Sequence, residues 1–263
     1  MIHTSWSARL LFVAGVVALP GAALGADVHV MISAGFYHVY AELGPAFERA
    51  SGHHLVTTRG PSMGDSPESI PTRLARGEAA DLVILDGGAA DKLASAGVLR
   101  ADSKVTLARS LIGMVVKAGA PKPDIGSVEA FKTTLLAAKS IACSDSGSGT
   151  YLSTKLFAKL GIADQVLSKN RRIRGPPSGE PVATVVARGE AEIGFQQVSE
   201  LLNVAGTDYV GTIPAELQPG FTFAGALTRA AGNAGAATAL LRFLNSPEAD
   251  AVKTKAGLMP AGQ

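Results

Sequence analysis

The sequence predicts an α/β protein with two similar lobes, each built on a mainly parallel sheet flanked by helices. Short strand-like runs, such as Asp-Leu-Val-Ile-Leu at 81–85, carry apolar side chains on both faces and alternate with helical patterns, which is typical of parallel strands covered on both sides. The alternation begins again near Leu111, and the pentapeptide Ala-Arg-Gly-Glu-Ala precedes a strand at both 75–79 and 187–191. A chain of 263 residues is long enough for both units.

The first 26 residues match a secretory signal peptide. Arg9 supplies a positive charge, residues 10–19 are apolar, and Ala23-Leu24-Gly25 is a small-x-small cleavage site. The apolar run is too short to span a bilayer, and no later run is long enough. We therefore expect an exported, periplasmic protein that is not embedded in a membrane.

The first unit is predicted to contain three strands, each followed by a helix. Glycines at 52 and 97 end two of the helices, because glycine adopts the left-handed cap conformation without strain. The elements predicted here are strands at 28–33, 55–58 and 81–85 and helices at 37–51, 69–76 and 91–96.

The second unit repeats this order, and a short tail follows it. The elements predicted here are strands at 111–116, 141–143, 173–175, 193–196 and 221–227 and helices at 128–138, 181–188, 200–205, 236–244 and 247–256, with one more helix from Thr150. The tail after residue 214 is too small to fold alone, so we expect it to pack on the first lobe. This assigns 27–108 and 215–263 to lobe 1 and 109–214 to lobe 2, with two crossings between them.

A polar, glycine-spaced loop at 144–149 separates a short apolar strand from the helix that Thr150 opens. Free N–H groups at a helix start, close backbone approach at glycine and the helix dipole together favour an anion. Donors expected here are Ser146, Ser148, Gly149 and Thr150. The alternative is an ordinary strand-to-helix turn with a capping hydroxyl. The spacing fits neither dinucleotide nor P-loop motifs.

Two open sheets joined by two crossings leave a cleft beyond the carboxyl ends of their strands. The strand-end residues expected to bind ligand there are Ser33, Gly35, Arg59, Ser62 and Gln197. The order Arg-Gly-Pro occurs at 59–61 and again at 174–176, so Arg59 and Arg174 could face each other and hold a di- or tricarboxylate. Alternatively, Arg174 belongs with Arg171 and Arg172 to a solvated or docking surface.

Other ligand classes find little support in the composition. A net charge of +2 without a dense basic run argues against nucleic acid. Cys143 is the only cysteine and is expected to be a small buried hydrophobe. His53 and His54 have no third ligand at a suitable spacing, so no metal or cofactor is expected.

Four segments carry a family resemblance that spans the mature chain: VHVMISAGF at 28–36, RLARGEAADLVIL at 73–85, VARGEAEIGF at 186–195 and FLNSPEADAVKTKAGLMPA at 243–261. With them the chain resembles the type II periplasmic solute-binding proteins of the molybdate-binding-protein-like branch. The resemblance implies the periplasmic-binding-protein type II fold, with two lobes that close on a ligand. It also implies a monomer and, in most members, delivery to an ABC permease.

Three positions depart from the pattern of molybdate binders. This chain has Gly35 where they place a serine, Arg59 in the loop that keeps Ser62, and Gln197 where they carry a tyrosine. The resemblance implies neutral donors around molybdate, whereas a guanidinium suits carboxylates. The sequence therefore favours a periplasmic binding protein for a small organic di- or tricarboxylate.

Two alternatives remain open. The branch includes an aconitate isomerase, which would move an allylic proton in the same cleft, and the candidate acid–base residues are His38, Ser62, Asp145 and Tyr151. The other alternative is a molybdate or tungstate carrier of an ABC importer.

Overall fold

The structure is a computed structural model that describes residues 25–202 and 204–262. The predicted signal peptide lies outside these residues except for its last two positions. Within the described chain, no helix is long and apolar enough to cross a membrane.

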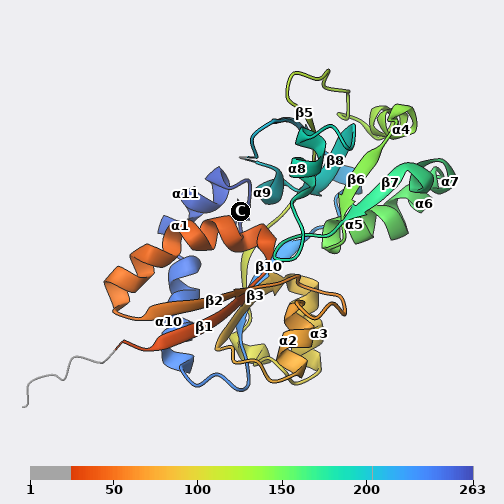
Figure 1. The fold of residues 1–263 in the computed structure, drawn as a ribbon. Helices are drawn as coiled ribbons and strands as arrows, with labels where there is room; N and C mark the ends of the chain where they lie inside the picture. The colour runs from red at the N-terminus through yellow and green to blue at the C-terminus, as the bar shows by residue number, and fades with distance from the viewer. Residues whose placement is uncertain (1–24, 203, 263) are drawn as a thin grey trace, which may run out of the picture.

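Lobe 1 is built on a six-stranded sheet with the strand order β11-β4-β10-β3-β1-β2 (Figure 1). Strand β1 pairs in parallel with β2 and β3, while β10 runs antiparallel to β3 and β4. The strands are β1 (Asp27–Ile32), β2 (His54–Arg59), β3 (Leu82–Asp86), β4 (Val105–Arg109), β10 (Thr222–Leu227) and β11 (Met259–Pro260). The tail of the chain thus completes the first sheet.

Helices cover both faces of this sheet. Val30 and Ile32 of β1 pack in the core beneath α1 and α10, whereas Met31 packs with Val83 and Leu85 beneath α2 and α3. This alternation follows from the two-residue period of a strand. The helices are α1 (Ala34–Ser51), α2 (Ile70–Ala75), α3 (Gly87–Ser95), α10 (Ala234–Leu244) and α11 (Pro247–Lys255), with a 3-10 turn at Ala101–Ser103.

Lobe 2 is built on a five-stranded sheet with the order β7-β6-β8-β5-β9. Strand β6 is parallel to β7 and β8, and β5 is antiparallel to β8 and β9. The strands are β5 (Ile112–Lys117), β6 (Ile141–Ser144), β7 (Asn170–Ile173), β8 (Ile193–Gln197) and β9 (Thr207–Thr212). The helices are α4 (Val128–Ala137), α5 (Gly147–Tyr151), α6 (Phe157–Lys159), α7 (Ala163–Val166), α8 (Val182–Ala187) and α9 (Val198–Leu201); a π-helical segment, Leu152–Leu156, joins α5 to α6, and 3-10 turns lie at Leu167–Lys169 and Ala215–Leu217.

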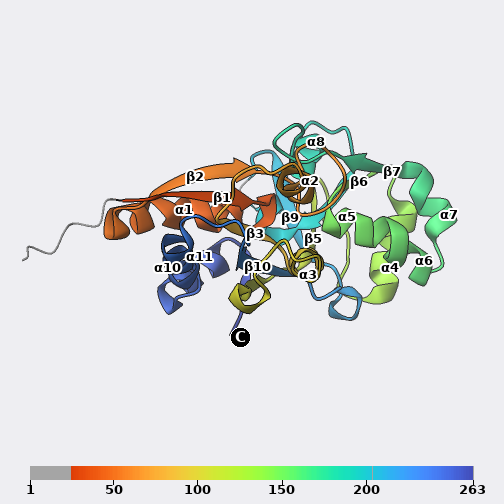
Figure 2. The same cartoon turned by 90° about the horizontal axis from the view of Figure 1, so that it is seen from below.

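The chain passes from the first sheet to the second between Arg109 and Ile112 and returns between Thr212 and Thr222. The two crossings are tied together, because the Ser110 N–H donates to the Phe221 carbonyl at 2.8 Å. The lobes also touch beyond the crossings, where the Ser199 hydroxyl donates to the Gly35 carbonyl at 2.7 Å. Figure 2 shows the two lobes side by side along the length of the molecule.

Several elements differ from the predicted ones. Helix α1 begins at Ala34 and α5 at Gly147, so glycines that were expected in loops lie in first helical turns. Strands β4 and β9 were not predicted, and the strand expected at 173–175 is β7, which ends at Ile173. The helix expected at 200–205 is α9, which ends at Leu201. At these positions the backbone conformation depends on pairing with neighbouring strands or on contact with the other lobe, and the local sequence pattern does not report either.

The repeated Ala-Arg-Gly-Glu-Ala segments occupy equivalent places. Each follows a short helix, α2 or α8, and leads into a buried strand, β3 or β8. Gly77 and Gly189 both have positive φ, at 81° and 77°, as the left-handed turn after each helix requires. The two lobes therefore share this helix–glycine–strand unit.

Candidate functional site

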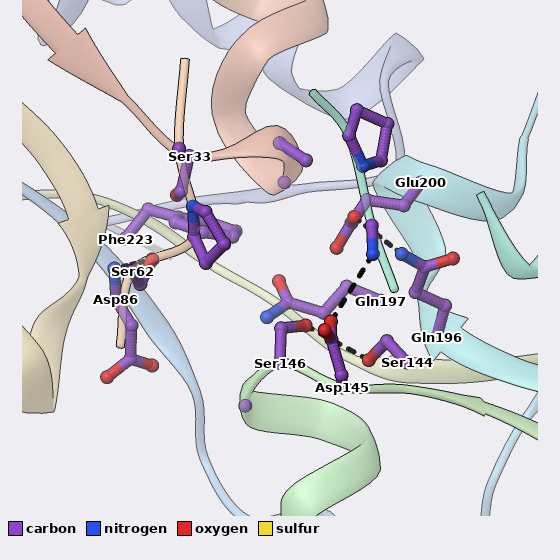
Figure 3. A pocket seen from close by; sticks show the side chains of 17 residues that line it. Ser33, Ser62, Asp86, Ser144, Asp145, Ser146, Gln196, Gln197, Glu200 and Phe223 are labelled. Carbon is purple, nitrogen blue, oxygen red and sulfur yellow. Dashed lines mark hydrogen bonds between the residues drawn. The ribbon is translucent and has the colours of Figure 1, made fainter. Parts of the chain in front are cut away.

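A cleft between the lobes, with a cavity of about 40 Å³, lies where parallel strands of both sheets end (Figure 3). Strands β1, β2 and β3 reach it from lobe 1, and β6, β7 and β8 reach it from lobe 2. The lining residues are Ser33, Ala34, Gly35, Gly60, Pro61, Ser62, Asp86 and Phe223 from lobe 1 and Ser144, Asp145, Ser146, Gly147, Gly175, Pro176, Gln196, Gln197 and Glu200 from lobe 2.

Ser33 sits at the start of α1 with a hydroxyl that is buried and has no hydrogen-bond partner among the described residues. Its side chain does not cap the helix, although serine commonly does. The first N–H groups of an 18-residue helix and one free hydroxyl therefore meet at the cleft. This arrangement suits an anionic acceptor.

The other lobe 1 polar groups are already engaged. The Ser62 hydroxyl accepts the N–H of Asp86 at 3.0 Å, and an Asp86 carboxyl oxygen caps α3 by accepting the N–H of Ala89 at 3.0 Å. Both side chains still line the cleft. Their role in the fold is to join the ends of β2 and β3.

In the loop at 144–149, which was predicted to bind an anion, the serine hydroxyls mainly bind one another. The Ser144 hydroxyl lies 3.0 Å from those of Ser146 and Ser148 and accepts the Gly149 N–H. Gly149 has no room for a side chain, since an added Cβ would lie 1.9 Å from the Ser144 carbonyl oxygen. Ser146 lines the cleft, whereas Ser148 and Gly149 are buried behind it.

Two glutamines end β8 and point in different directions. Gln197 lines the cleft, and its carbonyl oxygen accepts the hydroxyl of Ser110 at 2.7 Å. Gln196 also lines the cleft, but it has other partners: its carbonyl oxygen accepts the N–H of Val182 at 3.1 Å, and its nitrogen donates to Glu200 at 2.6 Å.

Glu200 is a carboxyl group that points into the cleft (Figure 3). Burial raises its pKa to about 7, since removal from water disfavours the charged form. The hydrogen bond from Gln196 and the charge of Arg59 act in the opposite direction, while Asp145 adds to the rise. A carboxyl that is partly ionised at neutral pH can both accept and donate a proton.

The arginines were expected to face each other across the cleft, and the structure does not place them so. The Arg59 guanidinium lies over the Tyr37 ring, 4.0 Å from its centre, and its Nε is buried with no hydrogen-bond partner in the described chain. Arg174 is exposed. Among the described residues, no lysine or arginine lines the cleft.

Three other predicted residues also lie outside the lining. His38 is exposed on α1. The Tyr151 hydroxyl donates to the Leu217 carbonyl at 2.8 Å, and the Thr150 hydroxyl accepts from Arg172 at 2.9 Å. Cys143 is fully buried, which raises its pKa to about 12, so it is not a thiolate nucleophile at neutral pH.

Sequence reasoning missed Glu200. It placed Asp86, Ser144 and Gln196 in strand-end loops at the cleft but gave them no individual role, and all three line the cleft. A usable signal was present for Glu200, because it lies in the first helical turn after β8, a strand that ends at the cleft. Its carboxyl was overlooked because the helix was expected to begin at that residue. In the described ranges, no group of three or more His, Cys, Asp or Glu side chains could hold a metal ion.

Comparison with known proteins gives a consistent family. Residues 28–259 match the model of the bacterial extracellular solute-binding protein family. An aconitate isomerase from a Pseudomonas species is 46% identical over 231 residues, which are 88% of this chain and 87% of that protein. The molybdate-binding protein ModA of Azotobacter vinelandii is 28% identical over 254 residues, 93% and 94% of the two chains. The solved periplasmic molybdate-binding protein of A. vinelandii superposes with a TM-score of 0.69 at 19% identity, over 88% of this chain and 98% of that one.

Proposed function

We propose that this chain, which belongs to the bacterial extracellular solute-binding proteins and to their molybdate-binding-like branch, binds aconitate between its lobes and interconverts the cis and trans isomers. The observation that carries the proposal is Glu200, an ionisable carboxyl in the cleft with a pKa of about 7. The 46% identity to an aconitate isomerase supports it. Binding an organic tricarboxylate, the function favoured by the sequence, is the first half of this reaction.

Neutral donors and helix starts are proposed to hold the carboxylates of the ligand. Ser33 offers a free buried hydroxyl beside the first N–H groups of α1, and Ser146 and Gly147 lie at the start of α5. Asp145 and Asp86 also line the cleft, but Asp86 is bound to its own helix. The charge of Arg59 acts on this site from behind the lining, as its effect on Glu200 indicates.

The reaction moves one proton between two carbons. Glu200 in its ionised form takes a proton from the methylene carbon next to the double bond of aconitate, and the electron pair of that C–H bond spreads over three carbons and the attached carboxylates. Glu200 then returns the proton to the far carbon, which shifts the double bond. No atom is gained or lost, and Glu200 ends in the form in which it began. A pKa near the working pH suits both steps.

Aconitate enters only when the lobes are further apart. The cavity of about 40 Å³ has room for only a few water molecules, which is too little for a six-carbon tricarboxylate. Opening at the two crossings, where Ser110 pairs with Phe221, would admit a six-carbon ligand. Closure then removes water from the reacting carbons.

A second candidate is a molybdate or tungstate carrier that delivers its ligand to an ABC permease. The small cavity, the serine hydroxyls and the helix starts at the cleft favour this candidate, as does the 28% identity to ModA. The position of Arg59 outside the lining also weakens the sequence argument against molybdate. In either case we propose that residues 1–26 direct export and that a periplasmic monomer is the working form.

Proton NMR of the purified protein with cis-aconitate in D₂O separates the two candidates. The isomerase is expected to accumulate trans-aconitate with deuterium incorporated at carbon. Thermal-shift measurements with both aconitates, citrate, molybdate and tungstate are made in parallel. A ligand present at 1,000 times its Kd is expected to stabilise the folded protein by about 4 kcal/mol. Stabilisation by aconitate without interconversion would contradict the isomerase, and stabilisation by molybdate alone would favour the carrier.

A further inference from the structure

A chain of two hydrogen bonds links the backbone of α8 to the carboxyl group of Glu200. The N–H of Val182 donates to the side-chain oxygen Oε1 of Gln196 at 3.1 Å, and Gln196 Nε2 donates to Glu200 Oε2 at 2.6 Å. Gln196 is 2% exposed and Val182 is 1% exposed, so the bond between them is shielded from water, whereas Glu200 is half-buried at the cleft. Figure 3 shows Gln196 beside Glu200 at the edge of the cleft.

The backbone N–H fixes which way the Gln196 amide faces. An N–H can only donate, so the group that meets Val182 must be the amide oxygen. The amide nitrogen therefore has to face Glu200. Val182 is the first residue of α8, where a backbone N–H has no acceptor within its own helix, and this leaves it available to hold Gln196.

The two carboxyl oxygens of Glu200 therefore have different roles. Because Oε2 faces a group that can only donate, it must act as an acceptor in both protonation states of the carboxyl. When Glu200 is protonated, its proton is on Oε1. We infer that Gln196 is a positioning residue that keeps the acidic proton of Glu200 on the oxygen turned to the cleft, where it can reach a ligand carbon. This inference rests on the proposed acid–base role of Glu200.

The charged surroundings of Glu200 come from three other elements. Arg59 at the end of β2 favours the ionised form, and Asp145 after β6 disfavours it. Asp86 lines the opposite wall of the cleft. The donor from Gln196 also favours the ionised form, so its loss is expected to make Glu200 hold its proton more tightly.

The matched pair Val182→Pro and Val182→Ala tests the inference without touching the cleft. Both replace the same buried, branched side chain, but only proline removes the N–H. Proline fits the first turn of a helix, and the preceding Pro181 has ψ of 146°, which a following proline requires. In Val182→Pro the Gln196 amide is free to turn over and present its oxygen to a protonated Glu200.

The measurement is a titration of the Glu200 carboxyl followed by ¹³C NMR, with its signal assigned by its absence in Glu200→Gln. The midpoint is expected to rise by about one pH unit in Val182→Pro, a tenfold change in proton affinity, and to stay unchanged in Val182→Ala. Gln196→Met, which removes the donor directly, is expected to show the same rise and serves if Val182→Pro does not fold.

Equal midpoints in wild type, Val182→Pro and Gln196→Met would overturn the inference. The titration needs no turnover, so a failure of this inference can be told apart from a failure of the proposed function. A protein that shows the shift but never interconverts aconitate would contradict the isomerase alone. Where turnover is present, the pH–rate profile is expected to move with the NMR midpoint, which a purely structural role of Gln196 would not produce.

Discussion

The side-chain nitrogen of Gln196 lies 2.6 Å from a carboxyl oxygen of Glu200, four residues later in the chain. The contact joins the end of β8 to the short helix α9, whose Ser199 also donates to the Gly35 carbonyl of lobe 1. The candidate acid–base group is therefore held by the segment that brings the lobes together. Closure of the lobes and the state of Glu200 are expected to depend on each other.

Replacement of Glu200 by glutamine is expected to lower the rate of aconitate interconversion by about 10²- to 10⁴-fold, the usual contribution of an acid–base group. Binding of a saturated tricarboxylate should change little, because glutamine keeps the shape and an acceptor for Gln196. NMR assays and calorimetry measure the two quantities. Glu216→Gln, at an exposed residue outside the cleft lining, is the control; an equal loss of rate there would contradict the assignment.

The same substitution is expected to change how stability depends on pH. Burial raises the pKa of Glu200 from 4.5 to about 7, so the folded state keeps a proton that the unfolded chain releases in this range. Wild type therefore loses stability as pH rises from 4.5 to about 7, and Glu200→Gln does not. Urea unfolding should show the variant about 1–3 kcal/mol more stable at pH 8, with a smaller difference near pH 4. A difference that is constant over pH would contradict this origin.

Ser33→Ala is expected to weaken ligand binding about tenfold without loss of stability. The Ser33 hydroxyl is buried and has no partner in the described chain, so its removal breaks no hydrogen bond of the free protein. Ser69→Ala is the matched control, since Ser69 caps α2 by accepting the Thr72 N–H. That variant should lose about 1 kcal/mol of stability and keep its affinity. Thermal unfolding with and without ligand measures the stability and the affinity of each variant. If Ser33→Ala kept its affinity and Ser69→Ala lost it, the anion would bind away from Ser33.

Gly35→Ser, which restores the serine of molybdate binders, is expected to hinder closure. A Cβ at this position would lie 2.2 Å from the Phe223 ring and 3.0 Å from the Gln197 side-chain oxygen. We expect affinity for tricarboxylates to fall about tenfold. To make room for the new side chain, the Phe223 ring or the lobe 2 segment with Gln197 must move away from α1. Gly235→Ser is the control, since an added Cβ there meets nothing within 4 Å. Unchanged affinity for tricarboxylates would contradict the expected clash with Phe223. A gain in molybdate affinity alone would show that position 35 selects between ligands instead of controlling closure.

The two arginines of the repeated Arg-Gly-Pro sequence are expected to differ. Arg59→Gln removes a charge that lowers the pKa of Glu200, so the midpoint of the pH–rate profile should rise. Arg174→Gln should leave both this midpoint and ligand affinity within about twofold, because the residue is exposed and outside the lining. A large loss of affinity in Arg174→Gln would restore the two-arginine clamp predicted from the sequence.

The candidate site was partly predictable because strand ends follow from local pattern. Ser33, Gly35, Ser62, Asp145, Ser146 and Gln197 were named from their positions after apolar strands, and all of them line the cleft. The direction of a side chain is less local. Arg59 and Thr57 are two residues apart, so both side chains lie on the same face of β2. On that face α1 places the Tyr37 ring under Arg59 and the Tyr40 hydroxyl against Thr57. Only the packing of α1 decides that this arginine lies on a ring rather than in the cleft.

The sequence by itself determined most of the strands and helices in their order, the repeated helix–glycine–strand unit and the family, since each depends on periodicity and on residues close together in the chain. Strands β4 and β9, which pair with distant parts of the chain, were not among them. The tertiary structure alone decided the chemistry of Glu200. Its pKa is raised by burial at the cleft, and its partner Gln196 is held by a helix that begins 14 residues earlier. Burial and the orientation of an amide depend on which distant surfaces meet, and no local pattern encodes them.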